Sequence, residues 1–580
     1  MSGKMRSNRQ AITRRQFLRS ASGLAVGAGA TALLGACAPK PTPTATAAPA
    51  APTKAPVAAS TQPPAPTVAP TKAPTAVPPT PTPAGPTKTL TIAVQETAAA
   101  EGWLPNMVST VAASPRGAVY DHPILTDPND RVKLVPGLFE SWTVKDLKEF
   151  TFRLRKGVQW QKGYGEVTAD DVAFTLELIT RADSKAIDGA FWRDRVKKMK
   201  VVDPYTITFT FDAFEPELTW MLSTHSHQKI VCKKYVETVG IDKANTEPVG
   251  SGPYKLVKSV PQSEYELDPS GPIHWRVNPK WAKIRCLNMP NEVSRLALLD
   301  SGRADITAIT MEQVDECRGK GYAIYTSDDM KFLAYIFGGL FNKGHKLYTG
   351  KEPWHDIRVR EAMNLAIDRD AINKTMFAGI GVIENVMGNA VASPDKTTAP
   401  LKIPYDPARA KALLAEAGYE KGFAFDLVSY PPQYPQVTQV VAASWEAIGL
   451  RPTIKMMDQA SWRSKVLKDE TNGVVYSWVN DFRVAFQARF EKFFYSKVEG
   501  FGIYYDDHLD SVYETLTKTG DQAEREKMLH DTMVYLRKQW AAVPIVSFPG
   551  TVFAASPKTI AGWKPLPRTQ WGTFEYIDPA

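Results

Sequence analysis

The sequence predicts an α/β protein with more than one sheet, divided into two or three lobes. Segments in which every second residue is apolar, typical of strands, cluster in one region. Segments with apolar residues at helical spacing dominate a later region. This mixed order favours sheets covered by helices. About 490 residues follow the proline-rich segment that ends at Lys88, and that length suits several separate cores.

Three segments have the pattern of strands. Thr89–Gln95, "TLTIAVQ", alternates between apolar and polar residues and is expected to open the fold. Phe150–Trp160 and Tyr205–Phe211 alternate in the same way. Such alternation is typical of antiparallel strands with one buried and one solvated face. We therefore expect these two segments to lie in an antiparallel sheet.

Three further segments have the start signals of helices. Thr168 is expected to cap a helix in which Asp171 reaches back to the cap residue. Asp356 and Asp406 are expected to cap two later helices, and Pro407 suits a first turn. The apolar stripes that we expect to be buried are Val172, Leu176 and Ile179, then Val359, Met363, Ala366 and Ile367, then Ala410, Leu413, Leu414 and Ala417.

Two short motifs are interpreted as structural. In "PVGSGPY", Gly250 and Gly252 are expected to form a tight turn into a strand, with a hinge or ligand-lining role as the alternative. The pair Asp368-Arg369 is expected to lie on the surface at a helix end.

The first 36 residues are predicted to be an export signal. They contain six basic residues and no acidic one, and an apolar run follows from Ala21 to Ala36. Arg14-Arg15 in "TRRQFLRS" resembles a twin-arginine motif, with an ordinary secretory signal as the alternative. A retained transmembrane helix is disfavoured, because sixteen residues rich in Gly and Ala fall short of the roughly 20 apolar residues that span a bilayer.

The end of this apolar run, "LLGAC", resembles a bacterial lipobox. The resemblance implies cleavage before Cys37 and lipidation of its thiol by a diacylglycerol, which partitions into the membrane at about 0.8 kcal/mol per methylene. The alternative is an ordinary cysteine in a discarded leader. We expect Cys37 to anchor the protein to the outer face of the cell membrane.

Ala38–Lys88 is predicted to be a disordered tether. It contains sixteen prolines among fifty-one residues, most of the others being Ala and Thr, and no aromatic or acidic residue. Such a segment cannot bury enough surface to offset its ordering entropy. As polyproline II it would reach on the order of 160 Å. O-glycosylation of its threonines is left open.

Charge and cysteine content exclude several classes of protein. Residues 89–580 contain 60 basic and 61 acidic residues, so the formal charge of +9 belongs to the signal and the tether. We therefore expect no nucleic acid partner. Besides Cys37 the chain has Cys232, Cys286 and Cys317, which permit at most one disulfide.

Six segments in order carry a resemblance to a known family. Together they resemble the family-5 extracytoplasmic solute-binding proteins, the receptors of oligopeptide, dipeptide and nickel ABC importers. The segments are "PGLFESWTV" (136–144), "FTFRLRKGVQWQKGYGEVTADDVAFTLE" (150–177), "EPVGSGPYKL" (247–256), "LLDSGRADI" (298–306), "WHDIRVREAMNLAIDRDAI" (354–372) and "YDPARAKALLAEAGY" (405–419).

This resemblance implies a two-lobed periplasmic-binding-protein-like fold of type II, cluster C, with a subdomain inserted in lobe one. It implies a monomer without catalytic activity or cofactor, which closes over a solute and delivers it to an ABC permease with a cytoplasmic ATPase. Mapped onto the chain, lobe one takes 89–118, 247–338 and 553–580, the insert takes 119–246, and lobe two takes 339–552.

The resemblance also implies where solute binds. In the oligopeptide-binding members a strand pairs with the peptide backbone, and an aspartate at its end meets the peptide's α-amino group. The matching residues are Ser477, Trp478, Val479 and Asp481. The proline that often follows the aspartate is absent here, and Arg483 is an alternative partner that would neutralise Asp481.

Other functions stay open as alternatives. Five tryptophans are candidates for a wall that stacks on an oligosaccharide, although each is more often a core residue. His225, His227 and Cys232 form a possible partial metal site, with a polar strand end as the alternative. No motif of a hydrolase occurs, so a secreted hydrolase and a purely structural lipoprotein are minor alternatives. The tryptophans are Trp103, Trp160, Trp445, Trp462 and Trp478.

Overall fold

The computed structural model describes twelve stretches of the chain, all within one compact unit, Thr80–Ala580. The export signal, Cys37 and most of the tether lie outside them. Within the described part of the chain, no helix is both long and apolar enough to cross a bilayer. The described residues are 86–95, 102–107, 116–127, 129–186, 189–224, 229–327, 330–386, 401–430, 434–481, 486–498, 500–564 and 573–580.

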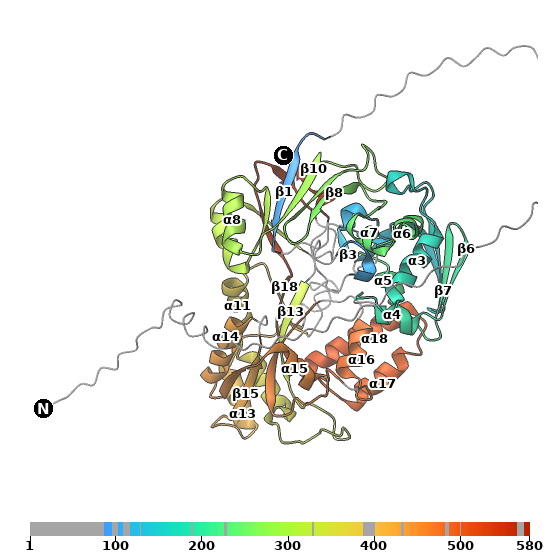
Figure 1. The fold of residues 1–580 in the computed structure, drawn as a ribbon. Coiled ribbons are helices and arrows are strands. Elements are labelled where there is room, and N and C mark those ends of the chain that lie inside the picture. Colours follow the sequence, from blue (N-terminus) through green and yellow to red (C-terminus); the bar gives the residue numbers. More distant parts are fainter. Residues whose placement is uncertain are drawn as a thin grey trace, which may run out of the picture. The chain divides into compact units, whose positions relative to one another are not determined.

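The largest sheet has seven strands, in the order β12-β19-β11-β1-β10-β9-β8. Its first strand, β1, lies in the interior of the sheet and pairs in parallel with β10 and β11 (Figure 1). The other pairs are antiparallel. The strands are β1 (Thr89–Val94), β8 (Tyr254–Val260), β9 (Glu264–Pro269), β10 (Lys283–Asn288), β11 (Ile306–Ile309), β12 (Ala323–Thr326) and β19 (Val552–Ala555).

A second sheet has six strands, in the order β14-β18-β13-β17-β15-β16. Its middle strand β13 is buried almost throughout, and it pairs antiparallel with β17 and β18. On the other side of β17, strands β15 and β16 run parallel to it. The strands are β13 (Met330–Phe337), β14 (Val382–Ile383), β15 (Ala424–Ser429), β16 (Arg451–Met456), β17 (Val474–Asp481) and β18 (Ala542–Pro549).

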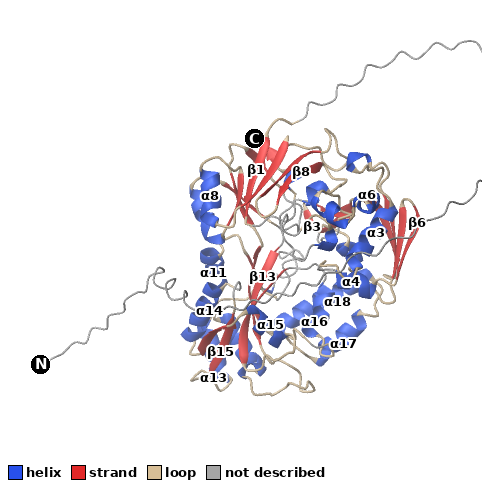
Figure 2. Ribbon diagram, viewed as in Figure 1, coloured by secondary structure: helices blue, strands red, loops and turns tan. Residues whose placement is uncertain are grey.

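A third, antiparallel sheet has the order β4-β5-β7-β6 and confirms the alternation in the sequence. Phe150, Phe152, Ile207 and Phe209 are buried on one face, and helix α3 packs on the same side (Figure 2). Two-stranded sheets complete the set. The strands are β2 (Ile124–Asp127), β3 (Asp130–Pro136), β4 (Phe139–Lys145), β5 (Glu149–Leu154), β6 (Lys198–Asp203), β7 (Thr206–Thr210), β20 (Ile560–Gly562) and β21 (Asp578–Pro579).

Helices cover these sheets, and the three predicted helix starts are confirmed. Thr168 and Asp171 form the capping box of α3, and Asp356 and Asp406 cap α10 and α13. The helices are α2 (Arg116–Val119), α3 (Ala169–Thr180), α4 (Gly189–Arg195), α5 (Leu218–Met221), α6 (Lys233–Val239), α7 (Ile241–Thr246), α8 (Glu292–Asp300), α9 (Val314–Gly319), α10 (Ile357–Leu365), α11 (Arg369–Met376), α13 (Pro407–Glu416), α14 (Pro435–Ala447), α15 (Gln459–Val466), α16 (Phe486–Phe494), α17 (Asp507–Leu516) and α18 (Gln522–Lys538).

The expectation for Arg369 is wrong. Only 4% of the residue is exposed, because its guanidinium donates to the carbonyl of Pro544 and to the carbonyl and side-chain oxygens of Asn364. Asp368 caps α11, as a residue at a helix start should. The buried side chain of Arg369 on α11 therefore links α10 and β18 by hydrogen bonds.

Among the described strands, the chain crosses between the two largest sheets twice. Strand β12 ends at Thr326 in the seven-stranded sheet, and β13 begins at Met330 in the six-stranded one. The chain returns between β18, ending at Pro549, and β19, beginning at Val552. The first change falls before the predicted boundary at residue 338, because β13 is paired on both sides within the six-stranded sheet. The division into lobes stays a prediction.

Candidate functional site

The two crossings between the large sheets lie side by side. The amide of Ser327 donates to the carbonyl of Thr551 at 2.9 Å, and the amide of Thr551 donates to the hydroxyl of Ser327 at 2.9 Å. Both residues are buried. A reciprocal pair of hydrogen bonds between two short connections is a suitable pivot, because both connections turn together.

Strand ends of both sheets meet these crossings. Val552, just after the second crossing, pairs with Ile309 at the carboxyl end of β11, and β1 is parallel to β11. Met330, just after the first crossing, begins β13, and β17 runs antiparallel to it and ends at Asp481. In α/β sheets, ligands bind outside the carboxyl ends of strands. The candidate site therefore lies at the carboxyl ends of β11, β15 and β17.

The predicted solute-binding strand is β17, and its backbone is only partly paired. On one side β17 pairs with β13 over seven residues, from Val475 to Asp481. On the other side it pairs with β15 only at Val474, Val475 and Tyr476. Among the described residues, nothing pairs with the second edge of β17 beyond Tyr476. The main-chain groups of this stretch are available for an added strand.

The side chain of Ser477 has a structural role. It is fully buried, and its hydroxyl lies 3.2 Å from that of Ser429. The chain of hydroxyls continues from Ser429 to Thr438 at 3.2 Å, and Tyr335 donates to Thr438 at 3.0 Å. These bonds join β13, β15, β17 and α14. Any contribution of Ser477 to solute binding therefore comes from its backbone.

Trp478 points into the core on the opposite face of β17. Its ring packs edge-on against Tyr476, Phe493 and Phe501, with centroids 5.4 to 6.2 Å apart. Only 7% of the residue is exposed, and its indole N–H has no partner among the described residues. Val479 is half-buried. Asp481 ends the strand opposite Lys331, and its side chain lies outside the described parts.

The other four candidate tryptophans are core residues as well. Trp103, Trp160, Trp445 and Trp462 are each at most 3% exposed. Trp160 donates to the carboxylate of Asp171, and Trp445 donates to the carbonyl of Met363. These five tryptophans therefore form no exposed aromatic surface on which a sugar could stack.

The possible metal site is only partly described. His225 and His227 lie outside the described residues. Cys232 is buried, and burial raises the pKa of its thiol to about 11. Cys232, Cys286 and Cys317 are all free thiols. Within the described stretches, no group of three or more His, Cys, Asp or Glu residues is placed to hold a metal ion.

The model of a family described as bacterial extracellular solute-binding proteins, family 5, matches residues 133–497. The chain belongs to this family. Membership confirms a solute-binding protein rather than an enzyme, and it places the folded part outside the cytoplasm.

Two curated family-5 relatives span most of the folded part. The dipeptide-binding protein of Escherichia coli (strain K12) is 26% identical over 378 residues, which cover 60% of this chain and 68% of that protein. Di/tripeptide-binding protein 1 of Pseudomonas aeruginosa (strain UCBPP-PA14) is 25% identical over 474 residues, which cover 75% of this chain and 84% of that protein.

Solved structures confirm the fold. HbpA2 from Haemophilus parasuis superposes with a TM-score of 0.70 at 17% identity, covering 85% of this chain and all of that one. The periplasmic binding protein DppA from Helicobacter pylori, in complex with the peptide STSA, superposes with a TM-score of 0.60 at 20% identity. The match covers 85% of this chain and 98% of that one. The predicted two-lobed periplasmic-binding-protein-like fold is therefore confirmed.

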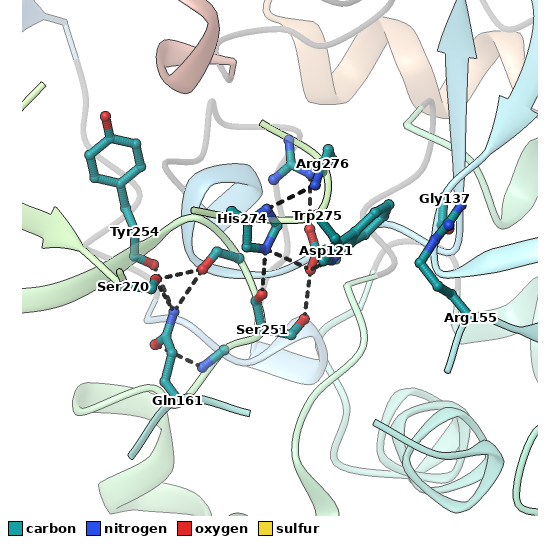
Figure 3. A network of polar contacts seen from close by, with 12 residues as sticks. Asp121, Gly137, Arg155, Gln161, Ser251, Tyr254, Ser270, His274, Trp275 and Arg276 are labelled. Atoms are coloured by element: carbon teal, nitrogen blue, oxygen red, sulfur yellow. Dashed lines mark hydrogen bonds and ion pairs between the residues drawn. The ribbon is translucent and has the colours of Figure 1, made fainter. Parts of the chain in front are cut away.

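Sequence reasoning missed a buried polar network in the part of this family-5 chain that holds the seven-stranded sheet (Figure 3). Asp121 accepts hydrogen bonds from Ser251 at 3.0 Å, Trp275 at 3.2 Å and Arg276 at 2.9 Å. Arg276 also donates to Glu575 near the C-terminus. Burial alone would raise the pKa of Asp121, but Arg276 and His274 lower it below its usual value.

The motif "PVGSGPY" needs its glycines because its backbone lies very close to the backbone of α2. A Cβ atom on Gly250 would lie 1.8 Å from the carbonyl oxygen of Val119, and one on Gly252 would lie 2.5 Å from that of Ala118. The amide of Gly252 donates to Val119. The glycines thus let this segment lie directly on the end of α2, with Ser251 reaching Asp121. No local pattern in the sequence could reveal partners more than 100 residues apart.

Proposed function

We propose that this protein is the solute receptor of an ABC importer and that it binds an extended peptide. The observation that carries the proposal is the edge of β17 beyond Tyr476, which has no strand partner among the described residues. A peptide added to such an edge gains main-chain hydrogen bonds whatever its side chains. The relatives named for dipeptides and tripeptides support this ligand class.

The proposed binding residues are those of β17. The backbone groups of Ser477, Trp478 and Val479 pair with the peptide, and the carboxylate of Asp481 binds its α-amino group. A carboxylate facing an ammonium away from water forms a strong charge-assisted bond. The parts that hold the seven- and six-stranded sheets are the two lobes, and they close about the crossings on either side of Ser327 and Thr551. Closure delivers the peptide to a membrane permease.

Binding is tested by thermal unfolding of the purified chain with peptides, oligosaccharides and metal complexes. A ligand at 100 times its dissociation constant adds about 2.7 kcal/mol to the free energy of unfolding. We expect stabilisation by peptides without their hydrolysis. Hydrolysis of peptides would instead support a secreted hydrolase. Stabilisation by sugars or metal complexes alone would show that the receptor binds one of these solutes and not a peptide.

The role of Asp481 is tested by Asp481→Asn, with Asp170→Asn as the matched control at an exposed position. Peptide affinity should fall by about tenfold in Asp481→Asn, or 1.4 kcal/mol, and stay unchanged in the control. Equal affinities of wild type and Asp481→Asn would remove the anchor role while leaving the receptor proposal intact.

We propose further that Cys37 carries the membrane anchor and that residues 38–88 are its tether. The lipobox-like "LLGAC" and the proline-rich composition support this proposal. Labelling of cells with radioactive palmitate should mark the wild type and not Cys37→Ala, which should leave the membrane fraction. A Cys37→Ala variant that still incorporates label would contradict the assignment.

A further inference from the structure

A cavity of about 290 Å³ lies between the part that contains the four-stranded sheet and the helices α16 and α17. One wall is the loop after β7, from Phe211 to Glu217, together with the end of α4. The opposite wall comes from Glu491 on α16 and from Tyr513 and Thr517, on and just after α17. Helices α4 and α16 lie side by side (Figure 1). No described wall residue belongs to β11, β15 or β17, so the cavity is separate from the proposed solute site.

Acidic side chains outnumber basic ones in these walls. Arg195 lies 3.1 Å from the carboxylate of Glu215 and 3.9 Å from that of Glu491. Lys197 lies 3.5 Å from Asp212. Both cations are therefore already paired with acidic residues of the cavity. The acidic wall residues are Asp194, Asp212, Glu215, Glu217 and Glu491, so the described walls carry an excess of three negative charges.

Two further cations stand behind the walls and reduce this excess to one. Burial raises the pKa of the Glu215 carboxyl above its usual value, although Arg195 and Arg525 act to lower it. The ammonium of Lys148 lies 5.0 Å from the ring centre of Phe214. Glu215 is only 2% exposed. A buried carboxylate whose charge is incompletely balanced favours an added cation.

The chemistry of the walls favours an organic cation over a metal ion. Phe211, Phe214 and Tyr513 give the cavity aromatic surfaces, and aromatic rings attract alkylammonium ions. Within the described stretches, no group of three or more His, Cys, Asp or Glu side chains converges to hold a metal ion. Ligand pockets start at about 300 Å³, so the volume fits a small molecule.

We propose that this cavity binds a small alkylammonium ion, with its charge beside Glu215 and its apolar body against the aromatic rings. The two walls belong to opposite sides of the proposed hinge, so the bound ion favours the arrangement in which they meet. This coupling rests on the proposed function. The ion and a peptide that closes the lobes should each raise the affinity for the other by the same factor, of about fivefold.

The test is titration calorimetry of the full chain with choline at fixed ionic strength. The matched probe is the neutral alcohol in which carbon replaces the nitrogen of choline, and it should bind at least about tenfold more weakly. Glu215→Gln should weaken choline binding at least about tenfold. Ala213→Lys adds an ammonium at an exposed position of the wall and should do the same. Glu177→Gln removes an exposed acid of α3 outside the cavity and should bind choline like wild type.

Four results would overturn the proposal. They are no binding of choline by wild type, equal binding of choline and the alcohol, choline binding that neither Glu215→Gln nor Ala213→Lys weakens, and displacement of choline by excess dialanine. The last result would place choline in the proposed solute site. Binding of choline without binding of any peptide would sink the proposed function and the coupling, and the cavity would keep its ligand. Thermal unfolding without choline should show that both variants keep the fold.

Discussion

Two buried tyrosines on neighbouring strands differ in whether the hydroxyl finds a partner. Tyr335 on β13 donates to Thr438 at 3.0 Å, whereas the hydroxyl of Tyr476 on β17 has no partner among the described residues. Both residues are fully buried. A buried hydroxyl without a partner loses its hydration and gains nothing in return.

At this scale we predict opposite effects of the same substitution. Tyr476→Phe should raise the free energy of unfolding by about 1 kcal/mol, and Tyr335→Phe should lower it by about 1 kcal/mol, because only Tyr335 loses a hydrogen bond. Urea unfolding of both variants measures the difference. A loss of stability in Tyr476→Phe would mean that a water molecule satisfies its hydroxyl.

The predicted site residues show what sequence patterns can and cannot decide about single side chains. The family resemblance pointed to a strand that contains Ser477, Trp478 and Val479, and these residues do lie in β17. Ser477 bonds to Ser429 and Trp478 packs on Phe493, partners that other parts of the chain supply. Such contacts depend on sheet order and on the layers around it, which local periodicity does not contain.

At the scale of elements, the N-terminus of α3 concentrates several bonds on one carboxylate. Asp171 accepts hydrogen bonds from the amides of Thr168 and Lys233, both at 2.9 Å, and from the indole of Trp160 at 3.3 Å. It therefore joins the start of α3 to the start of α6 and to the loop after β5. Its neighbour Asp170 is exposed and stands in the same first turn.

Substitutions of the adjacent residues Asp170 and Asp171 can therefore be compared as a matched pair. The hydroxyl of Thr168 also donates to the carboxylate of Asp171, at 3.2 Å. Asp171→Ala leaves these four donors without their acceptor and should lower the free energy of unfolding by about 3 kcal/mol. Asp170→Ala removes only a favourable charge near the helix start and should lower it by about 0.5 kcal/mol. Chemical denaturation of both variants checks the values. Equal losses would show that the helix dipole, and not the shared bonds, stabilises this end.

Helix boundaries could be predicted because their signals lie within a few residues. Asp406 and Pro407 marked the start of α13, which runs from Pro407 to Glu416. Sheet order could not be predicted, because β1 pairs with β10 and β11 about 200 residues later. The change of sheet at Met330 was missed for the same reason, since β13 owes its place to β17 and β18.

At the scale of the whole folded unit, helix α4, which precedes the edge strand β6 of the four-stranded sheet, contacts helix α16. Arg195 from the end of α4 lies 3.1 Å from Glu215 and 3.9 Å from Glu491 on α16. A cavity of about 290 Å³ opens between these segments, and Phe211, Phe214 and Tyr513 contribute to its walls. The ion pair with Glu491 therefore joins segments that belong to opposite sides of the proposed hinge.

If the lobes open about the crossings, the pair between Arg195 and Glu491 must separate, so it favours the arrangement in which it is made. Glu491→Gln should weaken peptide affinity by up to about fivefold, because a half-exposed ion pair contributes at most about 1 kcal/mol. Since salt screens such pairs, the effect should shrink between about 50 mM and about 500 mM salt in titration calorimetry. Glu514→Gln is the control. Glu514 on α17 pairs with Lys497, which lies between α16 and α17, so this ion pair does not cross the proposed hinge. Equal weakening by both variants would exclude this role for Arg195.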